Sequence, residues 1–156
     1  DAVACDSCAI KNLIYQYAHH IDNGDLDAVA NMFTHGKVVA VDEEGMGTDI
    51  VGTTAIAALY RSFTRIYEDT GTPHTLHMTS NVMVDVAPDT LTASARSYAM
   101  VFQALADFPL QPIIGVHYYD RFGQTEGGWH FTERRIDTRL AGNLSRHLLK
   151  ASGRQG

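Results

Sequence analysis

The chain has 156 residues and a formal net charge of −6, and 45% of its residues are hydrophobic, 19% charged and 9% aromatic. This is the composition of an ordinary globular protein with room for one domain, which excludes a disordered tail, a collagen-like rod and a disulfide-dense scaffold. The 12 basic residues are scattered, which argues against a nucleic-acid binder, because such proteins gather Lys and Arg to neutralise phosphates. No apolar run approaches the roughly 18 residues that cross a bilayer. We therefore expect a cytoplasmic protein that binds neither nucleic acid nor a membrane.

The two cysteines, Cys5 and Cys8, form a C-x-x-C motif. A redox role needs this motif at a strand-to-helix junction of a βαβ unit, and a zinc site needs at least one further pair of ligands nearby. Neither context is visible in the sequence. We interpret the pair as two thiols at the start of a helix.

The N-terminal half has mainly helical periodicity. From Ser7 to Asp22 the apolar residues recur with the spacing of one helix face, namely Ile10, Leu13, Ile14, Tyr17, Ala18 and Ile21. Asn23-Gly24 ends this helix, and a shorter helix follows from Asp25 as its cap to Phe33. Residues 37–42 and a return segment ending near Gly52 are strand-like. Thr53 then caps a third helix, whose stripe is Ile56, Leu59, Tyr60, Phe63, Ile66 and Tyr67.

After Gly71 the periodicity changes to that of strands. Four β-rich segments cover 74–86, 90–104, 113–124 and 128–140, and turn signals separate them at 88–89, 109–112 and 126–128. Short turns between long strands indicate antiparallel hairpins. Helices grouped early and strands grouped late predict an α+β domain, in which the concave face of a curved antiparallel sheet wraps around three N-terminal helices. We expect one domain over residues 1–156, with 1–7 and 145–156 as peripheral tails.

Asp22 is the first candidate functional residue. It lies about 40° around the helix from Ala18 at 100° per residue, so it borders the apolar stripe. A carboxylate in the last turn of a helix opposes the helix dipole, at a typical cost of about 0.3–1 kcal/mol, so another interaction should compensate it. The alternative is a solvated acid that helps to cap the next helix.

His77 is the second candidate. On a strand it projects from the same face as Thr79 and Asn81, which makes that face polar over successive positions, as the wall of a pocket would be. The alternative is a hydrogen-bonded histidine on an exposed sheet face. His74 would point to the opposite face, so we expect no metal site in this H-x-x-H segment.

Taken together, these segments resemble a known family. Tyr17 and Asp22 precede the motifs His77-Met78-Thr79-Ser80-Asn81, Tyr118-Tyr119-Asp120-Arg121-Phe122 and Gly127-Gly128-Trp129, the last followed by Arg134. Their order and spacing resemble the SnoaL-like group of the nuclear transport factor 2-like superfamily over roughly residues 8 to 140. The resemblance implies a cone-shaped α+β fold. The superfamily includes dehydratases, a dehydrochlorinase, ketosteroid isomerase and small subunits of ring-hydroxylating dioxygenases, so the fold alone does not determine the function.

The resemblance also implies roles for individual residues. In the dehydratases a helix-borne Asp pairs with a strand-borne His that an Asn follows four residues later, and Asp22, His77 and Asn81 match these positions. Tyr17 matches a tyrosine of the bile-acid dehydratase. Arg134 matches a pocket arginine, with Arg135 as an alternative one residue away.

The chemistry of these residue types agrees with an elimination. A neutral imidazole accepts a proton near pH 7, and a buried carboxylate orients it. We therefore predict a cofactor-independent lyase of the dehydratase type without a metal, in which Asp22 orients His77 and Tyr17 or Tyr118 assists the leaving group. The alternatives are an isomerase or cyclase with the same base, a ligand-binding module, and a dioxygenase small subunit.

Apolar and aromatic residues on the third helix and the strands complete the predicted pocket for a small hydrophobic cyclic substrate. The expected substrate-binding residues are Val39, Val41, Tyr60, Asn81, Tyr98, Phe102, Tyr118 and Arg134. Each aromatic residue among them could instead belong to the core, since a helical stripe is first of all a packing face. The resemblance further implies a homo-oligomer, with a trimer favoured over a dimer.

Overall fold

The computed structural model describes residues 5–149. Two helices come first, α1 (Asp6–Asp22) and α2 (Leu26–Asn31), and are followed by two short strands, β1 (Lys37–Val41) and β2 (Gly47–Val51), and by helix α3 (Thr53–Phe63). Four long strands follow, namely β3 (Thr75–Val86), β4 (Thr92–Leu105), β5 (Phe108–Thr125) and β6 (Gly128–Ala141). The predicted α+β class is confirmed.

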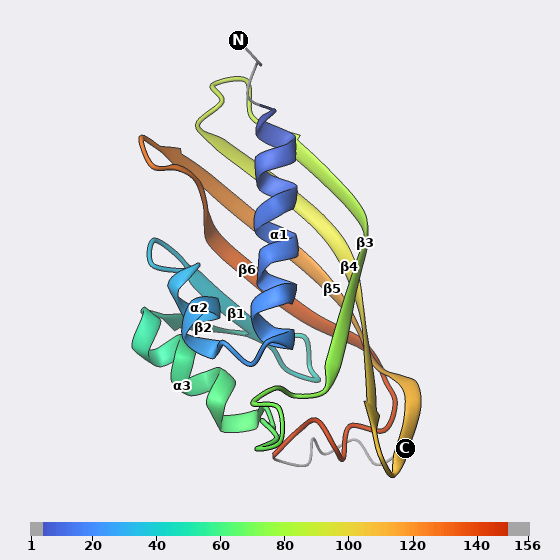
Figure 1. Ribbon diagram of the computed structural model, residues 1–156. Coiled ribbons are helices and arrows are strands. Elements are labelled where there is room, and N and C mark those ends of the chain that lie inside the picture. The colour runs from blue at the N-terminus through green and yellow to red at the C-terminus, as the bar shows by residue number, and fades with distance from the viewer. Residues whose placement is uncertain (1–4, 150–156) are drawn as a thin grey trace.

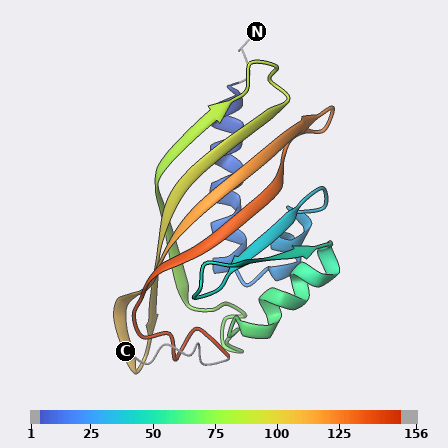
Figure 2. The same ribbon diagram turned by 180° about the vertical axis from the view of Figure 1, so that it is seen from behind.

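All six strands form one sheet in the order β2-β1-β6-β5-β4-β3. Neighbouring strands are antiparallel except β1 and β6, which pair in parallel. Figure 1 shows α1 lying along the concave side of the curved sheet, with α2 and α3 beside the short strands. Seen from behind in Figure 2, the long strands β3 to β6 present their other face without a covering helix.

The alternation of side chains along β4 explains how α1 approaches the sheet. The core residues Ala93, Ala95 and Ala99 project toward the helix, and they are small. The large residues of the same strand, Tyr98 and Phe102 among them, project to the other face. Ile10, Ile14 and Tyr17 of the helix pack with these alanines in one core cluster.

Helix α3 differs from its prediction at both ends. Gly52 is its N-cap, at φ +92°, without a side-chain cap bond, whereas Thr53 had been expected there. The helix ends at Phe63, so Ile66 and Tyr67 lie outside it. Thr64 is extended and forms an antiparallel bridge with Leu148. The return of the C-terminal segment therefore ends this helix.

The β4–β5 turn also differs from its prediction. Leu105 pairs directly with Phe108, and β5 continues through Pro109 and Pro112, where the sequence had indicated a loop. The pairing of β5 with β6 extends only as far as Ile114. The two prolines therefore lie on an edge, where a missing backbone N–H removes no hydrogen bond from a second neighbour.

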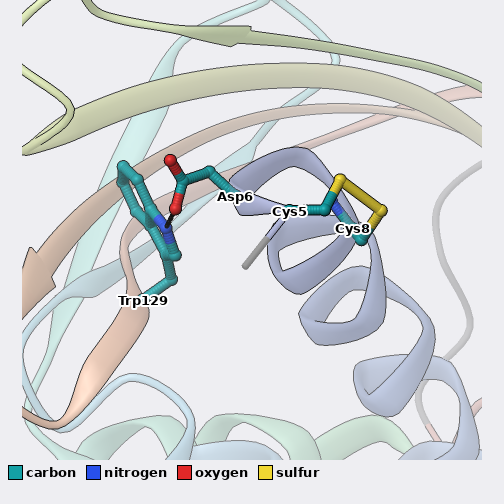
Figure 3. The surroundings of a disulfide bond; sticks show 4 residues. All are labelled: Cys5, Asp6, Cys8 and Trp129. Atoms are coloured by element: carbon teal, nitrogen blue, oxygen red, sulfur yellow. Dashed lines mark hydrogen bonds between the residues drawn. A yellow bond between two sulfur atoms is a disulfide. The ribbon is translucent and has the colours of Figure 1, made fainter. Parts of the chain in front are cut away.

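The N-terminal cysteines are joined, which corrects the expectation of two thiols. Cys5 and Cys8 form a disulfide at the first turn of α1 (Figure 3). Cys5 is the N-cap residue, and its Sγ accepts a hydrogen bond from the Cys8 amide at 3.2 Å. Beside it, Trp129 Nε1 donates to Asp6 Oδ1 at 2.9 Å, which ties the start of the helix to β6.

The residues 145–149, expected to be part of a peripheral tail, pack against the end of α3 through backbone hydrogen bonds to Phe63 and Arg65. The remainder of that expected tail, 150–156, lies outside the described residues, as do residues 1–4. Within the described part of the chain, no helix is long and apolar enough to span a membrane.

Candidate active site

Asp22 and His77 meet at the end of α1. The Nδ1 of His77 lies 2.6 Å from Asp22 Oδ1, and the backbone N–H of His77 donates to Oδ2 at 2.8 Å. Thr75 Oγ1 also donates to Oδ1 at 2.8 Å. Burial alone would raise the pKa of Asp22, but the hydrogen bonds from His77 and Thr75 outweigh burial and lower it. Asp22 is therefore a carboxylate at neutral pH.

The pairing determines which nitrogen of His77 is available. An ionised carboxylate only accepts hydrogen bonds, so Nδ1 carries the proton that it donates to Asp22, and Nε2 is left as the acceptor. The side chain of His77 is 7% exposed and lines a cavity that is open to one side. The arrangement has the geometry of an oriented general base.

The cavity has a volume of about 400 Å³. Most of its wall is apolar, contributed by Ile21, Val38, Ala40, Val41, Leu59, Phe63, Val101, Ile114, Val116, Ile136 and Leu148. Its polar groups are three phenols, two imidazoles and two hydroxyls, from Tyr17, Tyr60, Tyr118, His77, His147, Thr64 and Thr138. Among residues 5–149, no Lys, Arg, Asp or Glu lines it. A concave, mostly apolar site with a few polar groups is typical of a small-molecule pocket.

The three tyrosines come together from different elements. Tyr17 of α1 and Tyr60 of α3 share a hydrogen bond between their hydroxyls. The ring centroids of Tyr17 and Tyr118 of β5 are 5.8 Å apart, in an edge-to-face arrangement. Burial raises the pKa of each phenol well above 10. All three therefore remain protonated at neutral pH. The Tyr17–Tyr60 hydrogen bond uses one of their hydroxyl protons, which leaves Tyr118 and one hydroxyl of that pair to donate to an oxygen that gains negative charge.

Arg134 lies behind this tyrosine cluster and not on the cavity wall. It is fully buried, and its Nε and Nη2 each donate to an oxygen of Asp120 at 2.9 Å. Its guanidinium carbon lies 4.2 Å from the ring centroid of Tyr17 and 3.8 Å from that of Tyr118. Arg135, the alternative candidate, instead donates to the Gly45 carbonyl at 3.2 Å.

Besides Arg134, four further expected substrate-binding residues do not line the cavity that contains His77. Tyr98 and Phe102 project from β4 to the outer face of the sheet, where Tyr98 is 47% exposed and stacks on His117. Val39 is buried, but the cavity side of β1 is formed by Val38, Ala40 and Val41.

Asn81 is displaced by a bulge in β3, where the register shifts between Ser80 and Met83. Its φ is +53°, in the left-handed region, and its side chain is exposed. Beyond the bulge the inward positions change parity, so Val82 and not Asn81 packs against the core.

The cavity also contains residues that the sequence did not single out, His147 above all. Thr138 and Ile136 share a face of β6, and an alternation argument could have found them. His147 follows a polar segment after the last strand, and the leucines on both sides of it, Leu144 and Leu148, are the one signal that this segment packs inward.

Comparisons with known proteins agree with this fold. The family model described as the SnoaL-like domain matches residues 2–135. The chain belongs to this family. No curated protein matches the sequence.

Three solved structures from Novosphingobium aromaticivorans are similar in fold. An NTF2-like protein with a cystatin-like fold is 24% identical, with a TM-score of 0.69 over 90% of this chain and 86% of that one. A proposed scytalone dehydratase is 21% identical, with a TM-score of 0.64 over 86% and 85% of the two chains. A proposed aromatic ring hydroxylase is 26% identical, with a TM-score of 0.67 over 92% and 99%. The chain thus has the NTF2-like, cystatin-like fold.

Proposed function

We propose that this protein is a cofactor-independent lyase of the dehydratase type that acts on a small hydrophobic cyclic substrate. The observation that carries the proposal is the contact between Asp22 and His77 beside an apolar cavity, with a 2.6 Å separation between Oδ1 and Nδ1. The fold similarity to a proposed scytalone dehydratase supports the same class of reaction.

In the proposed elimination, His77 Nε2 takes a proton from a carbon next to the one that bears a hydroxyl group. The electrons of the broken C–H bond form the carbon–carbon double bond, and the C–O bond breaks. The departing hydroxide takes up the proton that His77 has accepted and leaves as water, which restores the neutral imidazole. Asp22 stabilises the imidazolium that forms on His77, and the Tyr17 phenol, bonded to Tyr60, donates to the oxygen on which charge develops.

An isomerase with the same base is the second candidate, because the protonated phenols of Tyr17, Tyr60 and Tyr118 would also stabilise an enolate. Neither a ligand-binding module nor a dioxygenase small subunit needs an oriented base beside a cavity, so the Asp22–His77 contact favours an enzyme over both. Product analysis separates the two enzymatic candidates, since elimination lowers the product mass by one water and isomerisation leaves it unchanged.

The base can be tested with 5-nitrobenzisoxazole, a neutral bicyclic probe. Removal of its C–H proton forms a nitrile, breaks the N–O bond and releases a coloured phenolate. We expect His77→Ala to lose about 10²–10⁴-fold in rate, the usual contribution of a positioned general base. The exposed His35→Gln is the matched control and should keep the rate.

A panel of cyclic β-hydroxyketones, analysed by mass spectrometry, then tests for loss of water. If His77→Ala and the unaltered protein turn over the probe and every ketone at the same rate, the lyase and the isomerase proposals both fail.

We also propose a homo-oligomer, with a trimer favoured over a dimer. Its support is a set of exposed apolar side chains on the outer face of the sheet, including Leu76, Met78, Met83, Tyr98 and Tyr119. A cytoplasmic location remains a prediction, and the Cys5–Cys8 disulfide is more typical of an oxidising compartment.

A further inference from the structure

The cavity contains a second imidazole that the proposed mechanism does not use. His147 lines the same cavity as His77 and the three tyrosines. It lies on the C-terminal strap, by which we mean residues 143–149, which follow β6 and return along the end of α3.

The backbone of the C-terminal strap is held without the imidazole. The amide of Arg65 donates to the His147 carbonyl at 2.8 Å, and the amide of Leu149 donates to the Phe63 carbonyl at 2.9 Å. The side-chain amide of Gln103 donates to the Arg146 carbonyl at 3.1 Å. Because these bonds use backbone groups of the strap, they would form with a different side chain at position 147.

The imidazole has no hydrogen-bond partner within residues 5–149, and its Nδ1 is buried without one. Burial lowers the pKa of His147 to about 4, with a further lowering from His77 that Asp22 opposes. The ring is therefore neutral at neutral pH, with one N–H donor and one acceptor nitrogen. A buried polar atom without a partner costs free energy, and a ligand in the cavity could supply that partner.

The other cavity groups restrict what such a ligand can be. Its described lining holds phenols, imidazoles and hydroxyls among aliphatic side chains, and no Lys or Arg that would attract an anion. A neutral imidazole suits an uncharged oxygen, either a carbonyl that accepts from its N–H or a hydroxyl that donates to its free nitrogen.

We propose that His147 is a substrate-binding residue, whose unpaired imidazole forms a hydrogen bond with a carbonyl or hydroxyl oxygen of an uncharged cyclic substrate. This inference rests on the proposed function, because it takes the cavity beside His77 as the substrate site. It deepens that function by restricting the substrate to uncharged, oxygen-bearing rings and by placing one oxygen next to the strap.

The test compares two ligands that differ in one carbonyl, 1-indanone and indane, by NMR titration. The unaltered protein should bind 1-indanone more tightly than indane. In His147→Phe that preference should fall by about 2- to 10-fold, the range of one neutral hydrogen bond. His147→Gln, which retains a donor and an acceptor, should keep most of the preference, and His35→Gln should keep all of it.

Thermal unfolding separates binding from a structural role. Because the ring bonds to no described residue, His147→Phe should unfold at a temperature no lower than the unaltered protein. The proposal is overturned if His147→Phe keeps the full preference for 1-indanone, if it loses both ligands equally together with stability, or if the unaltered protein binds neither ligand. These outcomes need no turnover, so they are distinct from a failure of the His77 test.

Discussion

At the scale of single residues, the site depends on one carboxylate in an unfavourable place. Asp22 is the last residue of α1, where the helix dipole opposes a negative charge. The contacts from His77 and Thr75 supply the compensation that such a position requires. The same contacts fix the tautomer of His77, so one set of hydrogen bonds both stabilises the helix end and prepares the base.

This arrangement predicts how stability changes with pH. The folded protein lowers the pKa of Asp22 below its ordinary value of 3.8, so its contribution is present above that value and is lost as pH falls through the lowered pKa. At pH 7 we expect Asp22→Asn to lower the free energy of unfolding by roughly 1–3 kcal/mol, since hydrogen bonds to a charged group are lost. Urea unfolding at pH 7 and pH 3 measures this. A difference between the two proteins that stays constant down to pH 3 would contradict the assignment of an ionised Asp22.

Single residues also show how much of the candidate site could be predicted from the sequence alone. Asp22 and His77 could be predicted as neighbours because a helix end and a strand start carry clear periodicity, and the family resemblance joined them. His147 could not, because no periodic element contains it and its position depends on backbone bonds to Arg65 and Phe63. Helices and strands can be predicted from repeating patterns of residues. The short segment that carries His147 has no such pattern, so its position could not be predicted.

At the scale of elements, the sheet shows why the size of a side chain does not predict which face of a strand it lies on. From the sequence, Tyr98 and Phe102 are expected among the apolar and aromatic residues that line the pocket. On β4 the residues that join the core around α1 are Ala93, Ala95 and Ala99, and Tyr98 and Phe102 lie on the opposite face. Which face of a strand is buried depends on what packs against it.

The bulge in β3 is the second local feature that changes a face. Asn81 has φ +53°, a conformation that asparagine and glycine adopt at a lower cost than β-branched residues. We expect Asn81→Gly to leave the free energy of unfolding within about 0.5 kcal/mol and Asn81→Val to lower it by about 1–2 kcal/mol. Chemical denaturation of both variants is the measurement. Equal stability of the two would mean that the bulge does not require this conformation.

The pairing of β5 with β6 contains a buried ion pair. Asp120 and Arg134 face each other across the two strands, and both side chains are 0% exposed. Removal of one partner leaves the other charge buried, so Arg134→Met should lower the free energy of unfolding by about 3–5 kcal/mol. The double variant Asp120→Leu/Arg134→Met should lose much less. If the double variant is as unstable as the single one, the charge of Arg134 is not what matters. Arg134 would then stabilise the protein by packing against Tyr17 and Tyr118.

At the scale of the whole molecule, the curvature of the sheet gives its two faces different environments. The concave face packs around α1 and, with α1, α3 and the C-terminal strap, forms the walls of the cavity. The outer face is left with exposed large side chains that pair by register across β3, β4 and β5, for example Met78 opposite Met100 and Tyr98 opposite His117. Apolar side chains gathered on one exposed face typically mark an association site.

The proposed homo-oligomer can be tested on this surface with charge. Light scattering of the unaltered protein should give the mass of several chains, three in the favoured case. Met78→Glu combined with Tyr98→Glu would bury two carboxylates in the interface, so it should yield single chains with unchanged circular dichroism. Met46→Glu is the control, because Met46 is 67% exposed in the β1–β2 turn, and β1 and β2 lie at the sheet edge opposite β3. A one-chain mass for the unaltered protein would remove the proposal. The same mass for the double variant as for the unaltered oligomer would place the interface elsewhere on the molecule.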